Sequence, residues 1–349
     1  MFNQKIKLGP KQYIGKDSPC FIIAEIGSNH NNNLKLAYRL IDEAKKTGAD
    51  AVKFQTFSAE KHFSKFAPGF SYLKNKPMFD LIKSLEINRN WHSKLIKYCN
   101  MKKIIFFSSP CDYEAVDQLY KLGVRIFKIA SFDITDLELV DYISKKKATT
   151  IISTGLASYD DIKRAVSICK KNKNRNLVLL QCTSLYPTPK KLVNLKCIES
   201  LRKKYKCLTG FSDHTLEGDS AIASIPIGSV ILEKHLTLSK KLKGPDHKFA
   251  MEPKEFTEMV KSIRNVEEAL GNGIKGLISK EEKEMHLKGR RSLHFSRDIN
   301  KGEKLTKKDF CIKRPGLGIK PFLLNKIIGL SLKQKVKKDQ WVTYKMLRK

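Results

Sequence analysis

The stretch 21–30, Phe-Ile-Ile-Ala-Glu-Ile-Gly-Ser-Asn-His, joins an apolar run of strand length to a polar end. A continuous apolar run is typical of a parallel strand that is covered on both faces, because both rows of its side chains are then buried. One charged residue, Glu25, lies inside the run, and Ser28, Asn29 and His30 follow it. The stretch therefore predicts a buried strand whose carboxyl end carries polar groups.

Seven further apolar runs of strand length follow at 51–54, 104–107, 126–129, 149–152, 177–180, 207–210 and 230–232. Amphipathic helical patterns lie between most of them, at 34–47, 91–102, 113–122, 137–146, 159–170, 195–204 and 253–270. Eight strands that alternate with helices over about 250 residues predict an α/β fold, the (β/α)8 or TIM barrel. An open doubly wound sheet is the alternative, and we favour it less because no Gly-rich dinucleotide fingerprint follows the first run.

The pattern changes after Leu270. Glycines at 271, 273 and 276 interrupt the helical pattern, and a charged stretch follows at 280–288. From Arg290 onward the segments are short and alternating, which indicates a small, β-rich domain. We expect a catalytic barrel over 1–270, a linker over 271–289 and the small domain over 290–349. The long second connection, 56–90, is expected to form part of a lid.

The composition argues against several other classes of protein. With 41% hydrophobic residues the chain can bury a large core, and no apolar run reaches the length of a membrane span. The net charge of +33 suggests nucleic acid as a partner, but the lysines are spread along helical patterns as on a solvated surface. We predict a cytoplasmic protein without an export signal and with no membrane or nucleic-acid partner. Its eight cysteines form no C-x-x-C pair and are interpreted as free thiols, mostly buried.

The ends of the predicted strands carry the candidate site residues. Lys53 and Lys128 each lie within an apolar strand, where an unpaired lysine is unfavourable, so we expect an anionic ligand beside them. Hydroxyl groups at four strand ends are expected to donate to the same phosphate or carboxylate, namely Ser109, Ser131, Ser153 and Ser212. For a single serine, a solvated strand end remains the simpler explanation.

His214 and His235 follow adjacent predicted strands. Because the ends of adjacent barrel strands lie close together, the two imidazoles can share a metal ion. Two histidines among oxygen groups suit an open Mn²⁺ or Mg²⁺ site, whereas a closed zinc site would need four nitrogen or sulfur ligands. Each histidine alone is better explained as a core residue, and the pair together favours the metal.

Several stretches closely resemble the sialic acid synthase family, which includes the pseudaminic and legionaminic acid synthases. The matching stretches are 22–30, 48–56, 153–155, 186–188, 212–215, 233–235, 244–246 and 313–316. Their order and spacing are highly specific, and the resemblance runs from about residue 14 to near the C-terminus. It implies a (β/α)8 barrel followed by an antifreeze-like (SAF) domain.

The resemblance also implies a set of ligands and partners. A divalent metal would be held by His214 and His235. Phosphoenolpyruvate would lie among Lys53, Ser109, Lys128, Ser131, Ser153, Ser184 and Ser212, while Glu25, Gln55, Tyr186, Glu233, Asp246 and Arg314 would face the sugar and the reacting carbons. The small domain would be swapped in a homodimer, so that Arg314 of one chain reaches the sugar site of the other.

The expected reaction is the condensation of phosphoenolpyruvate with an open-chain N-acylated hexosamine of the N-acetylmannosamine type, which gives a nine-carbon 2-keto acid and phosphate. Glu25 is the candidate for proton transfer near the aldehyde, and Glu233 for orienting metal-bound groups. A 6-deoxy diacetamido hexose is the alternative substrate: residues 128–133 look more like the pseudaminic acid synthases, and residues 244–248 more like the legionaminic acid synthases. Ser184 stands where the neuraminate-making members often have asparagine.

Two non-enzymatic alternatives belong to other classes. A polyanion-binding protein would explain the charge but leaves the polar strand ends unexplained. A carbohydrate- or ice-binding module could be argued from the C-terminal region alone, but it leaves the barrel unexplained.

Overall fold

The computed structural model describes residues 1–69, 77–276 and 278–349. It divides into two compact units, Met1–Gly271 and Asn272–Lys349, and each is described here by itself. The division lies beside the predicted end of the barrel at residue 270. The separate limits of the linker and of the small domain stay a prediction.

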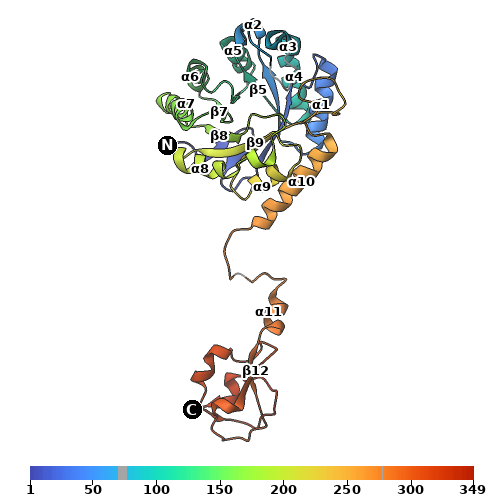
Figure 1. The fold of residues 1–349 in the computed structure, drawn as a ribbon. Coiled ribbons are helices and arrows are strands. Elements are labelled where there is room, and N and C mark those ends of the chain that lie inside the picture. Colours follow the sequence, from blue (N-terminus) through green and yellow to red (C-terminus); the bar gives the residue numbers. More distant parts are fainter. Residues whose placement is uncertain (70–76, 277) are drawn as a thin grey trace. The chain divides into compact units, whose positions relative to one another are not determined.

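The first unit is a closed parallel barrel (Figure 1). Its eight strands are β3 (Phe21–Gly27), β4 (Ala51–Thr56), β5 (Ile105–Pro110), β6 (Ile126–Ile129), β7 (Thr149–Ser153), β8 (Leu177–Cys182), β9 (Leu208–Asp213) and β10 (Ile231–His235). Each strand pairs with the next in chain order, and β10 pairs with β3 to close the sheet. All eight predicted apolar runs form these strands, which confirms the predicted barrel.

Helices surround the barrel in Figure 1 and bury their apolar stripes. They are α1 (Leu34–Lys46), α4 (His92–Lys102), α5 (Tyr113–Lys121), α6 (Leu137–Lys145), α7 (Tyr159–Lys171), α8 (Lys196–Tyr205), α9 (Asp219–Ser224) and α10 (Pro253–Leu270). Four of them, α1, α5, α6 and α7, begin where a polar side chain accepts a free backbone N–H: the Asp112 carboxylate accepts from Ala115, and Ser158 forms a capping box with Asp161. The seven predicted helices are present with ends within two residues.

The second connection of the barrel contains two short helices, α2 (Ala59–His62) and α3 (Met78–Leu85). Both contribute side chains to the cavity described below. Part of the predicted lid, residues 70–76, lies outside the described residues. An N-terminal hairpin of β1 (Lys5–Lys7) and β2 (Tyr13–Gly15) was not expected, because its strands are too short for a periodic pattern.

The second unit has its own hydrophobic core, which includes Leu293, Phe295, Ile299 and Val342. Two antiparallel pairs form its sheets: β11 (Ser292–Phe295) with β12 (Phe310–Lys313), and β13 (Ser331–Leu332) with β14 (Leu347–Arg348). A short helix, α11 (Lys283–Gly289), precedes them. The unit is therefore β-rich but built from short strands joined by turns.

All eight cysteines are free thiols, and five of them are buried, in agreement with the sequence interpretation. Among the helices of the described residues, none is both long and apolar enough to cross a bilayer.

Candidate active site

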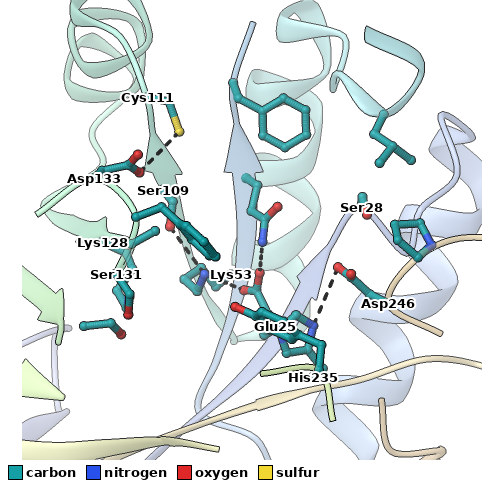
Figure 2. A pocket seen from close by; sticks show the side chains of 18 of the residues that line it. Glu25, Ser28, Lys53, Ser109, Cys111, Lys128, Ser131, Asp133, His235 and Asp246 are labelled. Carbon is teal, nitrogen blue, oxygen red and sulfur yellow. Dashed lines mark hydrogen bonds and ion pairs between the residues drawn. The ribbon is translucent and has the colours of Figure 1, made fainter. Parts of the chain in front are cut away.

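The carboxyl ends of the barrel strands open on one cavity of about 410 Å³ (Figure 2). Its lining contains thirteen of the predicted site residues: Glu25, Lys53, Gln55, Ser109, Lys128, Ser131, Ser153, Tyr186, Ser212, His214, Glu233, His235 and Asp246. The strand geometry explains why they meet. Side chains alternate between the two faces of a strand, so Glu233 and His235 face the cavity while Lys234 between them faces away.

Two predicted residues lie outside the lining. Ser184 is packed against Gly155, where a Cβ atom would lie only 2.5 Å from Ser184 Oγ and 2.9 Å from Ser131 Oγ. Glycine at 155 therefore allows both hydroxyls to approach. Arg314 belongs to the second unit, where its side chain is exposed. Their roles stay predictions.

An ion cluster occupies the floor of the cavity. Lys53 Nζ lies 2.8 Å from Glu25 Oε2 and 3.7 Å from Glu233 Oε1. It also donates to Ser109 Oγ at 3.3 Å, and Gln55 donates to Glu25 Oε1 at 2.8 Å. The register of the sheet produces these contacts, because Glu25 is paired with Lys53 and Gln55 with Ser109 on neighbouring strands.

Burial and charge act differently on the three ionisable groups of this cluster, Glu25, Glu233 and Lys53. Burial raises the pKa of Glu25 to about 7, although Lys53 opposes the shift. Burial also acts on Glu233, but Lys128 and Lys53 outweigh it and lower the pKa of that carboxyl. For Lys53, Glu233 and Glu25 outweigh burial and raise the pKa. The cluster thus holds one carboxyl that titrates near neutrality and one that stays ionised, while elsewhere in the cavity burial raises the pKa of Asp246 to about 6.

Lys128 is the less compensated of the two lysines. Burial lowers its pKa although Glu233 partly offsets the effect, and its Nζ donates to the Ile129 carbonyl at 3.1 Å. Among the described residues, the buried Ser153 Oγ has no hydrogen-bond partner. Ser131 Oγ accepts from Gly155 N–H at 2.9 Å, which leaves its own proton free to donate. An anionic ligand would satisfy these groups together.

The two histidines are suitably arranged for a metal. Their ring centroids lie 5.5 Å apart. His214 Nδ1 lies 3.0 Å from the Thr183 carbonyl, which can only accept, so Nδ1 carries a proton and Nε2 is the nitrogen that could bind a metal. His235 Nδ1 is buried without a hydrogen-bond partner among the described residues, 3.9 Å from Asp246 Oδ2. Burial lowers the pKa of His235, whereas at His214 burial is outweighed by the neighbouring Cys182, which raises the pKa. Two imidazoles beside a carboxyl group are a suitable ligand set for a divalent cation, which would displace the proton from His214 Nε2.

A buried ion pair behind the cavity fixes the ends of β9 and β10. Lys234 Nζ lies 2.8 Å from Asp213 Oδ2 and also donates to the Thr215 carbonyl at 2.5 Å, and both charged side chains are almost fully buried. Each partner is adjacent in sequence to one histidine of the pair, so this contact positions both imidazoles.

The cavity also contains residues that were not predicted. Polar ones are Ser28, His62, Cys111, Asp133 and Cys182, and apolar ones are Phe57, Phe63, Met78, Leu81, Ile82, Leu85, Phe132 and Phe249. For Cys111 and Cys182 a signal was present, since both lie shortly after predicted apolar runs: Cys111 directly follows β5 and Cys182 is the last residue of β8. The apolar residues that α2, α3 and their connection place in the lining gave no such signal in the sequence, because apolar residues in a connection more often pack into the core.

Together these features define a TIM-barrel protein with a candidate active site at the carboxyl ends of its strands. Residues 40–275 match the model of the NeuB family, and residues 290–348 match the SAF domain. The chain therefore belongs to the NeuB family, and the predicted SAF domain is confirmed.

Named relatives cover almost the whole chain. The N,N'-diacetyllegionaminic acid synthase of Campylobacter jejuni is 38% identical over 92% of this chain and 98% of its own length. The pseudaminic acid synthase of the same species is 35% identical over 92% of this chain and 94% of its own. A crystal structure of the N-acetylneuraminic acid synthetase of Leptospira borgpetersenii, 36% identical, covers 81% of this chain and 95% of that chain with a TM-score of 0.73.

The raised pKa of Glu25 predicts a pH-dependent stability difference. Between its ordinary value of 4.5 and about 7, the carboxyl is protonated when folded and ionised when unfolded, so folding is favoured at low pH. Relative to Glu25→Gln, the wild type should lose roughly 1–3 kcal/mol of unfolding free energy between pH 5 and pH 8. Urea unfolding of both proteins at the two pH values measures this loss.

Glu268→Gln, at an exposed residue of α10, is the control and should follow the wild type. A difference that stays constant or grows with pH would contradict the assignment.

Proposed function

We propose that this protein condenses phosphoenolpyruvate with the open-chain form of an N-acylated hexosamine of the N-acetylmannosamine type. Water would add to C2 of the pyruvyl unit and the C–O bond to phosphate would then break, so the products would be a nine-carbon 2-keto acid and inorganic phosphate. The observation that carries the proposal is one cavity that joins a buried lysine–carboxylate cluster to a pair of metal-competent histidines. The names of the relatives support it, since these are synthases of three acids of this kind.

Phosphoenolpyruvate fits the cationic side of the cavity. Lys128 and Lys53 offer two ammonium groups, and Ser109, Ser131 and Ser153 add hydroxyls around them. In a buried site these donors act more strongly on phosphate and carboxylate than they would in water. Their positions are held by the strands, so little reorganisation is needed when charge moves toward the departing phosphate.

Proton transfer is assigned to Glu25. With a pKa of about 7 it is present in both forms at neutral pH, which suits a group that gives a proton to the aldehyde oxygen as the carbon–carbon bond forms. Gln55 and Lys53 orient its two oxygens. Glu233 remains ionised and accepts from Ser212 Oγ at 3.2 Å, so its role is to orient groups rather than to donate protons.

His214 and His235 are proposed to hold Mn²⁺ or Mg²⁺, with Asp246 close by. When bound, such an ion would supply Lewis acidity toward the sugar aldehyde. Tyr186 packs against His214 with 4.3 Å between ring centroids and the two rings tilted by 38°, a contact that limits the movement of the imidazole.

One observation favours the 6-deoxy diacetamido hexose as a second candidate substrate. The side chains of Phe63, Met78, Leu81, Ile82 and Leu85 form an apolar wall of the cavity, supplied by the second connection. Such a wall stabilises the methyl group of a 6-deoxy sugar, at about 0.8 kcal/mol for each buried methylene-sized group, and disfavours a hydroxyl at that position.

The substrate assay offers both candidate sugars to the enzyme in the same condensation with phosphoenolpyruvate. Phosphoenolpyruvate is offered with N-acetylmannosamine and with the 6-deoxy diacetamido hexoses, and products are identified by mass spectrometry. A nine-carbon acid and an equal amount of phosphate are expected. If the apolar wall selects the sugar, kcat/KM should favour the 6-deoxy substrate by about tenfold or more, and Leu81→Ser should reduce that preference. No product from any of these sugars would contradict the proposal.

Metal dependence through the histidine pair is a separate prediction. Chelation should abolish turnover, and Mn²⁺ or Mg²⁺ should restore it. His214→Ala and His235→Ala should each lose activity by about 100-fold or more, because each change removes one of the two proposed metal ligands. The control is His286→Ala on α11, which should keep its rate. Full activity of His214→Ala or His235→Ala in the presence of chelator would contradict a role for the metal in the reaction.

We also propose that a second copy of the chain supplies Arg314 to the sugar site. The proposal rests on the resemblance of residues 313–316 to the family and on the exposure of Arg314, whose guanidinium offers a rigid fork of donors for an acyl carbonyl or hydroxyls.

Complementation tests this arrangement. Arg314→Ala and His235→Ala chains are mixed under conditions that let subunits exchange. Each heterodimer would hold one site with both lesions and one intact site, so about half of its sites should work. A mixture as inactive as its parents, although heterodimers are shown to form, would contradict the supply of Arg314 by a partner chain.

A further inference from the structure

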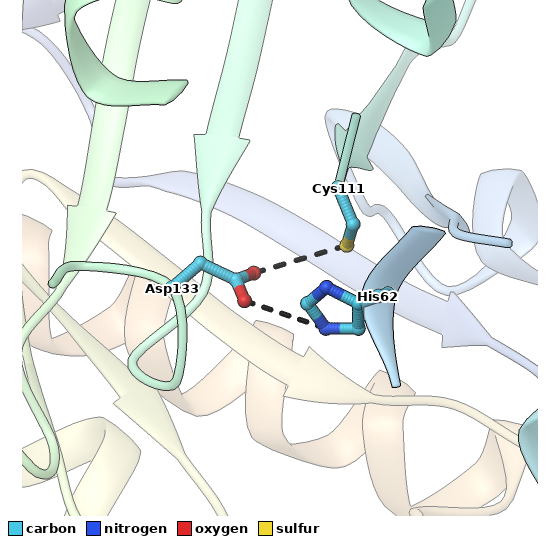
Figure 3. Close-up of side chains that lie close together, drawn as sticks. All are labelled: His62, Cys111 and Asp133. Carbon is cyan, nitrogen blue, oxygen red and sulfur yellow. Dashed lines mark hydrogen bonds and ion pairs between the residues drawn. The ribbon is translucent and has the colours of Figure 1, made fainter. Parts of the chain in front are cut away.

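A second group of metal-binding side chains lines the same cavity, apart from the histidine pair. His62 is the last residue of α2, Cys111 directly follows β5, and Asp133 lies four residues after β6 (Figure 3). Their ligand atoms all lie within 4.8 Å of one another. The proposed condensation uses none of the three, so the group needs an explanation of its own.

The distances are close to those of a coordination site. His62 Nε2 lies 3.4 Å from Asp133 Oδ1, and Cys111 Sγ lies 3.8 Å from Asp133 Oδ2. With zinc bonds of about 2.0 Å to nitrogen and oxygen and about 2.3 Å to sulfur, tetrahedral ligand atoms stand about 3.3–3.5 Å apart. The third pair, His62 and Cys111, lies within 4.8 Å, so movements of up to about 1 Å would bring the three side chains onto one ion.

The donor atoms of the three side chains indicate which class of metal ion this group would bind. An imidazole, a thiol and a carboxylate offer nitrogen, sulfur and oxygen, which is a typical zinc set. Mn²⁺ and Mg²⁺ prefer oxygen and are poor partners for a thiolate. The histidine pair has no thiol as a direct neighbour except Cys182, whose Sγ lies 3.8 Å from His214 Nδ1, the protonated ring nitrogen.

The local charge also suits a dication. Lys53 and Lys128 affect Cys111 and Asp133, but these two ammonium groups are already balanced by Glu25 and Glu233. Burial raises the pKa of the Cys111 thiol, and its S–H donates to Asp133 Oδ2 at 3.8 Å, so the metal-free group holds a neutral thiol beside a carboxyl group that is only 7% exposed. A bound dication would take the sulfur as a thiolate, with release of the thiol proton, and would balance the negative charge of both ligands.

We propose that His62, Cys111 and Asp133 form a binding site for a zinc-class divalent cation, with a fourth position open to the cavity. Its ligands come from three separate elements, so a bound ion ties α2 to the ends of β5 and β6. Because α2 carries His62 beside Phe63 of the apolar wall, occupancy fixes that side of the cavity.

Co²⁺ is a suitable probe, since a thiolate bound to it gives a sulfur-to-metal charge-transfer band in the near ultraviolet. The full-length chain, stripped of metal and reduced, is titrated with Co²⁺. We expect the band to appear and to be erased by Zn²⁺. Cys111→Ser should abolish it, while Asp133→Asn and His62→Gln should weaken the Co²⁺ affinity measured from it by at least about tenfold.

The matched control is Cys182→Ser, which removes the thiol beside the histidine pair and should keep the band. Circular dichroism of each metal-free variant checks folding, and the partly exposed His62 offers a variant that leaves the core intact. The proposal is overturned if the wild type gives no band, if the band persists in Cys111→Ser, or if it is lost in Cys182→Ser. None of these readouts depends on turnover, so they test this site independently of the proposed condensation.

Discussion

The parallel pairing of β10 with β3 is the constraint on which the site depends. It closes the sheet, brings all eight carboxyl ends to one rim and pairs His235 with Glu25, which is itself paired with Lys53 on β4. Residues more than two hundred positions apart in the sequence thereby become neighbours. In an open sheet β3 and β10 would not meet, and the lysine–carboxylate cluster would be separated from the histidines.

Within the closed barrel, the balance of buried charge gives two similar side chains, Glu25 and Glu233, different pKa values. Glu25 and Glu233 are both buried beside Lys53, yet burial dominates at Glu25, whereas two ammonium groups and His214 dominate at Glu233. One carboxyl therefore titrates near neutral pH and the other stays charged. Pairs of carboxyls whose environments separate their pKa values in this way are well suited to divide proton transfer and electrostatic stabilisation between them.

The second connection adds a different chemistry to the same cavity. Its helices supply an apolar wall and His62, whereas the strands supply the charged floor. A rigid barrel with variable connections at its carboxyl face allows this division, because the strands hold the floor in place while the connections can differ in length and sequence. This arrangement suits a family whose named members make several related acids.

The local sequence was sufficient to determine the barrel and the floor of its site. Apolar runs with strand length, lysines inside two of them and histidines after two adjacent ones depend only on periodicity and on the cost of burying charge, and the eight site residues predicted in this way line one cavity. The resemblance to the family added the other five that line it, namely Glu25, Gln55, Tyr186, Glu233 and Asp246. Only the tertiary structure placed His62 beside Cys111 and Asp133, turned α3 toward the cavity and left Ser184 outside its lining. It also decided which carboxyl has the raised pKa. These features depend on distances between separate connections and on the sum of several opposing charges, and neither quantity is encoded in the pattern of any single segment.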